Sequence, residues 1–266
     1  MSETWLEGRV VENRQWTEAL FSLRVEAPNL GFEAGQFVRI ALDVEGERVA
    51  RAFSFVNPPA DPVLEFYGIV VPEGLLSPRL ARLAPGERLW VAPRTAGFLV
   101  LSELPEAESL WLMSTGTGIA PFLSMLRTET PWKRYREVVL VHGVRHRREL
   151  VYQDLIRSMP RLKYLSFVSR EAAPGALAGR IPAAVADGRL EAAAGVRIAP
   201  ETSQVMLCGN PEMLKDASAA LVARGLRKHR RRNPGQISVE SQPGRGSRFV
   251  VELPCAGAPQ PQPQPA

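Results

Sequence analysis

Hydrophobic and polar residues alternate over short stretches throughout the first hundred residues. These stretches are rich in β-branched and aromatic residues, and turn signals such as Pro28-Asn29, Pro58-Pro59 and Pro85-Gly86 separate them. Short strands at this spacing are typical of a small antiparallel barrel. The predicted strands are Arg9–Asn13, Leu20–Glu26, Gln36–Leu42, Val49–Val56, Leu64–Val71 and Arg88–Ala92.

The pattern changes near residue 105, where short apolar runs begin to alternate with helical segments. An alternation of strand and helix predicts a parallel sheet with crossover helices, so we expect a β-barrel followed by an α/β fold. The predicted strands are Ser109–Ser114, Val138–His142, Tyr164–Val168 and Val205–Cys208. The predicted helices are Pro121–Arg127, Arg148–Ser158, Ile181–Asp187 and Pro211–Arg224.

A polar stretch that contains Pro105, Leu101–Ala107, lies between the two patterns. We therefore expect one domain over residues 1–102 and a second over residues 103–240. Residues 241–266 form a third, atypical segment that ends in a Pro/Gln-rich tail, which we expect to be disordered.

The composition is that of a globular protein, with 45% hydrophobic and 23% charged residues. No apolar run is long enough for a membrane span, and the first residues do not have the pattern of a secretory signal, so a cytoplasmic protein is expected. The 2 cysteines provide neither a disulfide framework nor a four-cysteine iron–sulfur cluster, and no metal is predicted. Redox chemistry in this chain would need an organic cofactor or a partner.

The net charge is +5, and the densest basic runs are RHRR at 145–148 and RKHRRR at 227–232. Such runs can be solvated helix ends, or they can bind an anionic ligand, an acidic protein or nucleic acid. The run at 227–232 has no aromatic residue on which a base could stack, so nucleic acid is not expected.

The strongest local motif is the glycine-containing turn Thr115-Gly-Thr-Gly118, which follows an apolar strand and precedes a helix. Glycines there let the backbone approach a pyrophosphate, and the helix start offers free N–H groups. Position 121 is Pro rather than the third glycine of the Rossmann fingerprint, so a simple strand-to-helix turn remains an alternative.

Two further motifs carry groups that could serve a flavin or a nucleotide. Arg51-Ala52-Phe53-Ser54 offers a cation for a phosphate, a ring for stacking and a hydroxyl for a ring nitrogen, although an ordinary amphipathic strand would look the same. Cys208-Gly209-Asn210 stands where a parallel strand ends, which is where open α/β sheets bind ligands. A lone cysteine there is more often a buried small residue.

Arg145, Arg170 and Arg180 each stand near the end of an element on the expected ligand side of the α/β half. Arginines at these places, rather than an acidic residue, favour a 2′-phosphate and therefore NADP over NAD. Any one of the three could equally be a surface residue.

Taken in order, these motifs resemble the ferredoxin/flavodoxin–NADP reductase family in its bacterial form, from about residue 5 to residue 240. The matching strings are GQFVRI (35–40), RAFSFVNPP (51–59), LEFYGIVVPEGLLSPRL (64–80), TGTGIAPFLSML (115–126), VHGVR (141–145), VSRE (168–171), GRIP (179–182), VMLCGNPEM (205–213) and HRRRNPGQISVE (229–240).

The resemblance implies an FAD-binding antiparallel β-barrel, followed by a five-stranded parallel α/β domain that binds NADPH. It implies that FAD contacts Arg51, Ala52, Phe53 and Ser54, with Phe66 and Tyr67 on the flavin's other side and Leu75, Leu76, Ser77 and Thr117 at the pyrophosphate. It implies NADP contacts from Thr115, Gly116, Gly118, Val144, Arg145, Ser169, Arg170, Arg180, Gly209 and Asn210. The implied catalytic residues are Ser54, Cys208 and Glu240, with Glu240 near the flavin edge.

The sequence departs from the family pattern in two places. Phe53 stands where tyrosine is usual, so ring stacking is kept and one hydroxyl contact is lost. Bacterial members stop soon after the position of Glu240, often with an aromatic residue that packs on FAD. Here the stretch from Ser241 resembles the closing strand of histidine-kinase ATP-binding domains instead.

The expected activity is electron exchange between NADPH and ferredoxin or flavodoxin, with hydride transfer to FAD followed by single-electron transfer. Those partner proteins are acidic, so the basic runs would attract them, and we expect the enzyme to be a monomer. An NADPH-dependent flavin reductase or an oxygenase-coupled reductase on the same fold is the enzymatic alternative. A nucleotide-responsive binding module that uses no FAD is the alternative from another class.

Overall fold

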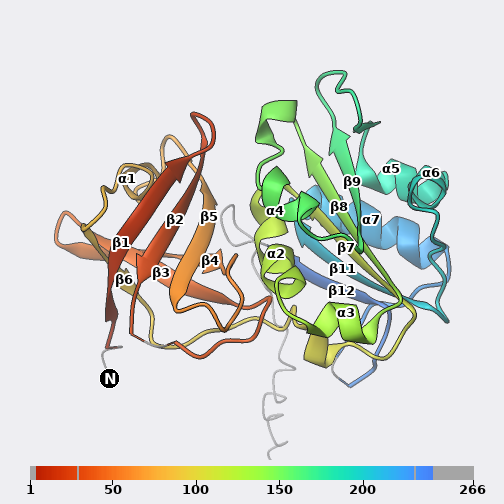
Figure 1. Ribbon diagram of the computed structural model, residues 1–266, viewed down its shortest axis with the longest axis horizontal. Coiled ribbons are helices and arrows are strands. Elements are labelled where there is room, and N and C mark those ends of the chain that lie inside the picture. Colours follow the sequence, from red (N-terminus) through yellow and green to blue (C-terminus); the bar gives the residue numbers. More distant parts are fainter. Residues whose placement is uncertain (1–3, 29, 231, 242–266) are drawn as a thin grey trace, which may run out of the picture.

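The computed structural model describes residues 4–28, 30–230 and 232–241. The Pro/Gln-rich tail and the rest of the atypical segment after Ser241 lie outside the described residues. Two lobes lie side by side, the N-terminal one built on an antiparallel sheet and the C-terminal one on a parallel sheet (Figure 1).

The N-terminal lobe is a six-stranded antiparallel sheet in the order β4-β3-β6-β1-β2-β5. An isolated bridge joins Phe55, just after the edge strand β4, to Phe66, within the edge strand β5, so the sheet curls into the predicted barrel. On the third strand Val38, Ile40 and Leu42 alternate with residues of the other face and are buried in the barrel core. The strands are β1 (Leu6–Gln15), β2 (Leu20–Glu26), β3 (Phe37–Val44), β4 (Glu47–Ser54), β5 (Val63–Ile69) and β6 (Arg88–Val91).

The C-terminal lobe is a parallel sheet in the order β10-β9-β8-β7-β11-β12, with helices on both faces. The five strands implied by the resemblance are present, and a two-residue edge strand, β10, extends them. The strands are β7 (Ser109–Thr115), β8 (Glu137–Val144), β9 (Leu162–Val168), β10 (Leu177–Ala178), β11 (Ser203–Gly209) and β12 (Ile237–Ser241).

The helices are mostly short, and none of those that the structure describes is long and apolar enough to cross a membrane. The α-helices are α1 (Ser77–Leu80), α2 (Ala120–Leu126), α3 (Thr130–Arg134), α4 (Gln153–Arg157), α5 (Ile181–Ala186), α6 (Arg189–Ala194) and α7 (Pro211–Ala223). Three 3₁₀ turns accompany them: η1 (Leu101–Glu103), η2 (Gly116–Ile119) and η3 (Arg147–Glu149).

The two faces of the parallel sheet pack into different cores. On β7, Trp111 and Met113 point into the core under α5, α6 and α7, whereas Leu110 and Leu112 point toward α2 and the barrel. Strand residues buried on both sides explain the continuous apolar runs in the sequence. The core on the α2 side of the sheet also contains Tyr67 of the barrel, so the two lobes share apolar packing.

One predicted helix, Arg148–Ser158, is wrong as a single element. The structure divides it into η3 and α4 because Tyr152 adopts a left-handed backbone with φ 60°. A tyrosine rarely takes that conformation, and it cannot continue a right-handed helix. Its ring packs instead between Trp16, at a centroid distance of 4.9 Å, and Tyr67, at 5.4 Å.

The stretch expected to be a polar connection between the lobes is largely packed. Leu101 and Leu104 are buried in the core that the lobes share. The Arg134 guanidinium on α3 donates to the Leu104 carbonyl at 2.9 Å. The chain crosses between the lobes as part of the interface.

Hydrogen bonds centred on Glu65 of β5 reinforce this interface. The carboxylate accepts from the Tyr152 hydroxyl at 2.9 Å and from Arg127, after α2, at 3.2 Å. Nearby, the Ser124 hydroxyl of α2 donates to the Asn57 carbonyl at 2.6 Å. These bonds, together with the shared core, fix the two lobes relative to each other.

Candidate active site between the lobes

The predicted glycine-containing turn lies at the carboxyl end of β7, as η2. Gly116 has a φ of +54°, and its carbonyl lies 3.0 Å from His142 Nε2. A carbonyl can only accept, so Nε2 carries the proton. Burial lowers the pKa of His142 to about 4, which keeps the ring neutral. A Cβ atom at Gly118 would lie 2.5 Å from the carbonyl oxygen of Cys208, so only glycine fits against the end of β11.

The Cys208-Gly209-Asn210 turn touches this loop from the neighbouring strand. The Asn210 N–H donates to Thr115 Oγ1 at 2.9 Å, and the Asn210 side chain caps α7 by accepting from the Glu212 N–H at 2.8 Å. Gly209 has a φ of +138°, and a Cβ there would lie 2.3 Å from Thr115 Oγ1. The two turns form one glycine-lined edge, on which residues 115–117 and Asn210 are accessible to solvent whereas Gly118 and Gly209 are buried.

Four polar residues lie side by side across the sheet face that points toward the barrel. The parallel registers pair His142 with Ser114, Ser114 with Cys208, and Cys208 with Glu240. Cys208 is 1% exposed, and burial, with the charge of Glu240, raises the pKa of its thiol. It is a buried protonated thiol rather than a nucleophile.

Glu240 reaches from β12 to the barrel lobe. A Cβ atom at Gly97 would lie 3.0 Å from Glu240 Oε1 and 3.1 Å from the Phe37 ring, and Phe37 is the strand partner of Ser54. Burial raises the pKa of Glu240 to about 7, and its Oε2 atom has no hydrogen-bond partner among the described residues. The structure therefore brings Cys208 and Glu240 together, with Ser54 on the barrel strand next to Phe37.

The barrel strand β4 presents its candidate residues on two faces. Arg51 and Phe53 share one face, and Ala52 and Ser54 share the other. The Arg51 side chain is exposed and donates to the Ala50 carbonyl at 2.7 Å, with no ion pair among the described residues. The Phe53 ring lies over Gly68, where a Cβ would approach it to 3.0 Å.

The structure places Phe66 and Tyr67, which the resemblance groups on one side of the flavin, on opposite faces of β5. Neighbouring residues on a strand point to opposite faces, and Phe66 is fully buried in the barrel core. Tyr67 points to the other lobe instead, and its hydroxyl is buried with no hydrogen-bond partner among the described residues. Only Tyr67 of the pair lies at the interface.

The segment expected at a pyrophosphate lies at the start of α1. Leu75 is 52% exposed, whereas Leu76 is buried in the barrel core. The Ser77 hydroxyl accepts from the Val71 N–H at 2.9 Å. The exposed Arg79 follows on the same turn and donates to the Leu75 carbonyl at 2.7 Å. The sequence prediction omitted this arginine, although it stands within the matching string.

The three candidate arginines meet at one edge of the parallel sheet. The Arg170 N–H donates to the Arg145 carbonyl at 3.0 Å, and Arg180 immediately precedes α5. The backbone N–H and the hydroxyl of Ser169 both donate to the Val144 carbonyl, at 3.1 and 3.2 Å. All three arginine side chains are exposed, and none has an ion pair among the described residues.

These features fit a dinucleotide on each side of the interface. A dinucleotide phosphate needs accessible backbone N–H groups and cations without carboxylate partners, and these are supplied by the glycine-lined edge and by Arg51, Arg145, Arg170 and Arg180. The unpartnered Tyr67 hydroxyl and Glu240 carboxyl oxygen are buried polar atoms that a bound ring system or its hydroxyls would satisfy. The described residues contain no group of His, Cys, Asp and Glu that could hold a metal ion.

The family matches divide along the same line as the two sheets. An oxidoreductase FAD-binding domain matches residues 6–94, and an oxidoreductase NAD-binding domain matches residues 112–219. The flavodoxin/ferredoxin–NADP reductase of Shigella flexneri is 48% identical over 217 residues, covering 80% of this chain and 88% of the relative. The ferredoxin–NADP reductase of Pseudomonas aeruginosa is 37% identical over 255 residues, covering 90% and 98%.

A solved structure has the same arrangement of both lobes. The ferredoxin NADP⁺ reductase of Neisseria gonorrhoeae, with bound FAD and NADP, superposes with a TM-score of 0.87 at 30% identity. The match covers 90% of this chain and 99% of the other.

Proposed function

The chain belongs to the flavodoxin/ferredoxin–NADP reductase family, and from this premise we propose how its residues exchange electrons between NADPH and ferredoxin or flavodoxin. The protein is an oxidoreductase that uses FAD and NADPH. The observation that carries the proposal is the contact of Glu240 with the barrel, because it places the end of the parallel sheet against the strands beside Ser54.

We assign residues 1–102 to the FAD-binding unit and residues 103–240 to the NADP-binding unit, supported by the two family matches. In the first unit Arg51 would pair with the FAD pyrophosphate, because its guanidinium is exposed and free of carboxylates. Ser54 and Tyr67 would meet the flavin ring. When bound, FAD accepts a hydride from NADPH and delivers electrons singly to the partner.

The second unit would hold NADPH along the glycine-lined edge. Gly116 leaves room for the cofactor because nothing lies within 4 Å of the position of its missing Cβ, Gly118 lets the turn pack against Cys208, and Asn210 shapes the adjoining turn. Arg145, Arg170 and Arg180 would bind the 2′-phosphate. Guanidinium groups suit that role because they remain charged and can form paired hydrogen bonds to phosphate oxygens.

Cys208, Glu240 and Ser54 would enclose the nicotinamide ring. The thiol of Cys208 is compact, uncharged and buried, so it can contact the ring and exclude water without adding charge. A Glu240 carboxyl with a pKa of about 7 can hold or release a proton near neutral pH, and it can donate a hydrogen bond while protonated.

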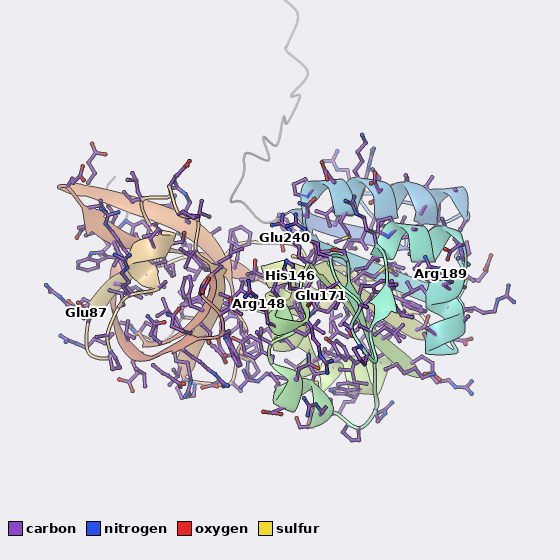
Figure 2. The ribbon with its side chains drawn as sticks, turned by 90° about the horizontal axis from the view of Figure 1, so that it is seen from above. Glu87, His146, Arg148, Glu171, Arg189 and Glu240 are labelled. Atoms are coloured by element: carbon purple, nitrogen blue, oxygen red, sulfur yellow. The ribbon has the colours of Figure 1, made fainter. Side chains whose placement is uncertain are left out.

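The two basic runs would attract the acidic electron carrier, and they lie at opposite ends of the parallel strands, the first after β8 and the second before β12. The side chains of Arg145, Arg147 and Arg148 in the first run are exposed. Figure 2 shows Arg148 on the side of the α/β lobe nearest the barrel. In the second run Arg227, Lys228, Arg230 and Arg232 are exposed. We propose that the protein acts as a monomer in the cytoplasm, where NADPH and reduced carriers meet.

The test is an anaerobic titration of FAD-loaded protein with NADPH, followed by addition of oxidised ferredoxin. We expect NADPH to bleach the flavin absorption and ferredoxin to restore it. A protein that stays colourless after FAD addition would refute the function. Flavin that bleaches and is reoxidised only by free flavin would favour the flavin-reductase alternative.

A further inference from the structure

The loops that carry Arg145 and Arg170 lie next to each other, although both arginines are positively charged. Two unpaired guanidinium groups repel each other, and each follows a different strand, so something must hold the loops together before a phosphate arrives. One backbone hydrogen bond, from the Arg170 N–H to the Arg145 carbonyl, joins them at 3.0 Å.

Glu171 supplies a second connection between the same loops. Its Oε1 atom accepts from the Arg147 N–H at 2.6 Å, and its Oε2 atom lies 3.5 Å from His146 Nδ1. Glu171 follows β9, whereas both partners lie in the loop after β8. Figure 2 shows His146 and Glu171 close together on the α/β lobe.

A second carboxylate orders the β8 loop from within. Glu149 accepts from the N–H groups of Arg145 and His146, at 2.9 and 3.3 Å. Both carboxylates therefore accept from backbone N–H groups, Glu171 also lies near the His146 imidazole, and neither forms an ion pair with the side chain of Arg145 or Arg170. Acidic residues can thus stand beside a phosphate site without neutralising its cations.

We infer that Glu171 is a positioning residue for cofactor selectivity: it ties the β8 and β9 loops so that Arg145 and Arg170 lie at the spacing that a 2′-phosphate requires. This inference rests on the proposed NADP site. The 2′-phosphate is the group that distinguishes NADPH from NADH, so an effect through these arginines must appear as a change in discrimination. A general loss of folding would affect both cofactors alike.

The experiment compares Glu171→Ala, Glu171→Gln and Arg170→Ala in FAD-loaded protein. One readout is the ratio of kcat/KM for NADPH to that for NADH, and the other is calorimetric binding of 2′,5′-ADP against 5′-AMP. Losing a charge-assisted tie should lower the ratio and weaken 2′,5′-ADP binding about tenfold in Glu171→Ala. Glu171→Gln should recover part of this loss, because its amide oxygen can still accept from the Arg147 N–H.

Glu137→Ala is the matched control. Glu137 pairs with Lys163 at 3.0 Å and links the same two strands at their opposite ends. The Glu137→Ala variant should have the same ratio of kcat/KM for NADPH to that for NADH as the wild type. If Arg170→Ala loses discrimination and Glu171→Ala keeps it, the inference is overturned and the phosphate site stands. If Arg170→Ala also keeps it, the arginine assignment itself is wrong. An equal loss with both cofactors in Glu171→Ala would reduce Glu171 to a structural residue.

Discussion

Replacing Glu240 by glutamine should make the protein more stable at alkaline pH. The carboxyl lies between the lobes, burial raises its pKa to about 7, and one of its oxygens has no partner among the described residues. Glutamine keeps the size of the side chain and removes its ability to ionise, so the substitution isolates the cost of the buried charge.

The size of the effect follows from the difference in proton affinity. At about 1.4 kcal/mol per tenfold change, the rise from 4.5 to about 7 corresponds to about 3 kcal/mol in the free energy of unfolding. Because the side chain is partly exposed, we expect solvent to reduce this to about 2 kcal/mol. Below pH 4.5 the carboxyl is protonated in both states, so the variant should match the wild type. Between pH 4.5 and 7 the unfolded chain ionises first, so wild-type stability falls and the advantage of the variant grows.

The assay is urea unfolding of both proteins at a fixed excess of FAD, at pH 5, 6, 7 and 8. The expected result is a gap that opens across this range and stops growing above the pKa of Glu240. Glu137→Gln, which removes a carboxylate paired with Lys163, should show no such gain. A gap that does not change with pH, or a wild type more stable at pH 8, would show that Glu240 is not a buried ionisable group.

Four further outcomes are expected. Arg51→Ala should purify largely without FAD, as judged from the ratio of visible to ultraviolet absorption, and full occupancy would remove Arg51 from the pyrophosphate site. Cys208→Ala should keep FAD and slow the stopped-flow bleaching by NADPH; an unchanged rate with a lower melting temperature would leave Cys208 as a core residue only. Gly118→Ala would place a methyl group 2.5 Å from the Cys208 carbonyl oxygen and should cost about 1–3 kcal/mol, so an unchanged melting curve would contradict that contact. Tyr152→Phe removes the donor to Glu65 and should cost about 1.5 kcal/mol in urea unfolding, and a neutral result would show that the bond adds nothing.

The periodicity of the sequence predicted the antiparallel sheet, four strands of the parallel sheet and their order along the chain, whereas a fifth parallel strand was implied only by the family resemblance. Alternation on β3 and continuous apolar runs on β7 and β11 reflect burial on one face and on two faces, respectively. The glycine-containing turn was also predicted from the sequence. The structure explains why position 118 is glycine, because a Cβ there would collide with the Cys208 carbonyl. Such signals are local, so a single sequence carries them.

What the sequence could not predict depends on partners far along the chain. The resemblance groups Phe66 with Tyr67, and only the strand geometry shows that Phe66 points into the barrel core. The break at Tyr152 arises from packing against Trp16 and Tyr67, which no helical pattern records. The contact of Glu240 with Gly97 likewise joins residues from opposite lobes.

The hydrogen bonds at Glu65 set a rule for building chimeric reductases. If a barrel from another protein were joined to this α/β lobe, the Tyr152 hydroxyl and the Arg127 guanidinium would need a carboxylate at the position of Glu65. Without it, the buried Tyr152 hydroxyl would lose its carboxylate acceptor, and Arg127 would keep only Asp61 at 3.5 Å and the Val56 carbonyl at 3.3 Å, so the interface between the lobes would be weaker even with both cofactor sites intact. Exchange of lobes should therefore succeed between chains that share this carboxylate. A barrel that lacks it should be given a glutamate at the position of Glu65 before it is joined to this α/β lobe.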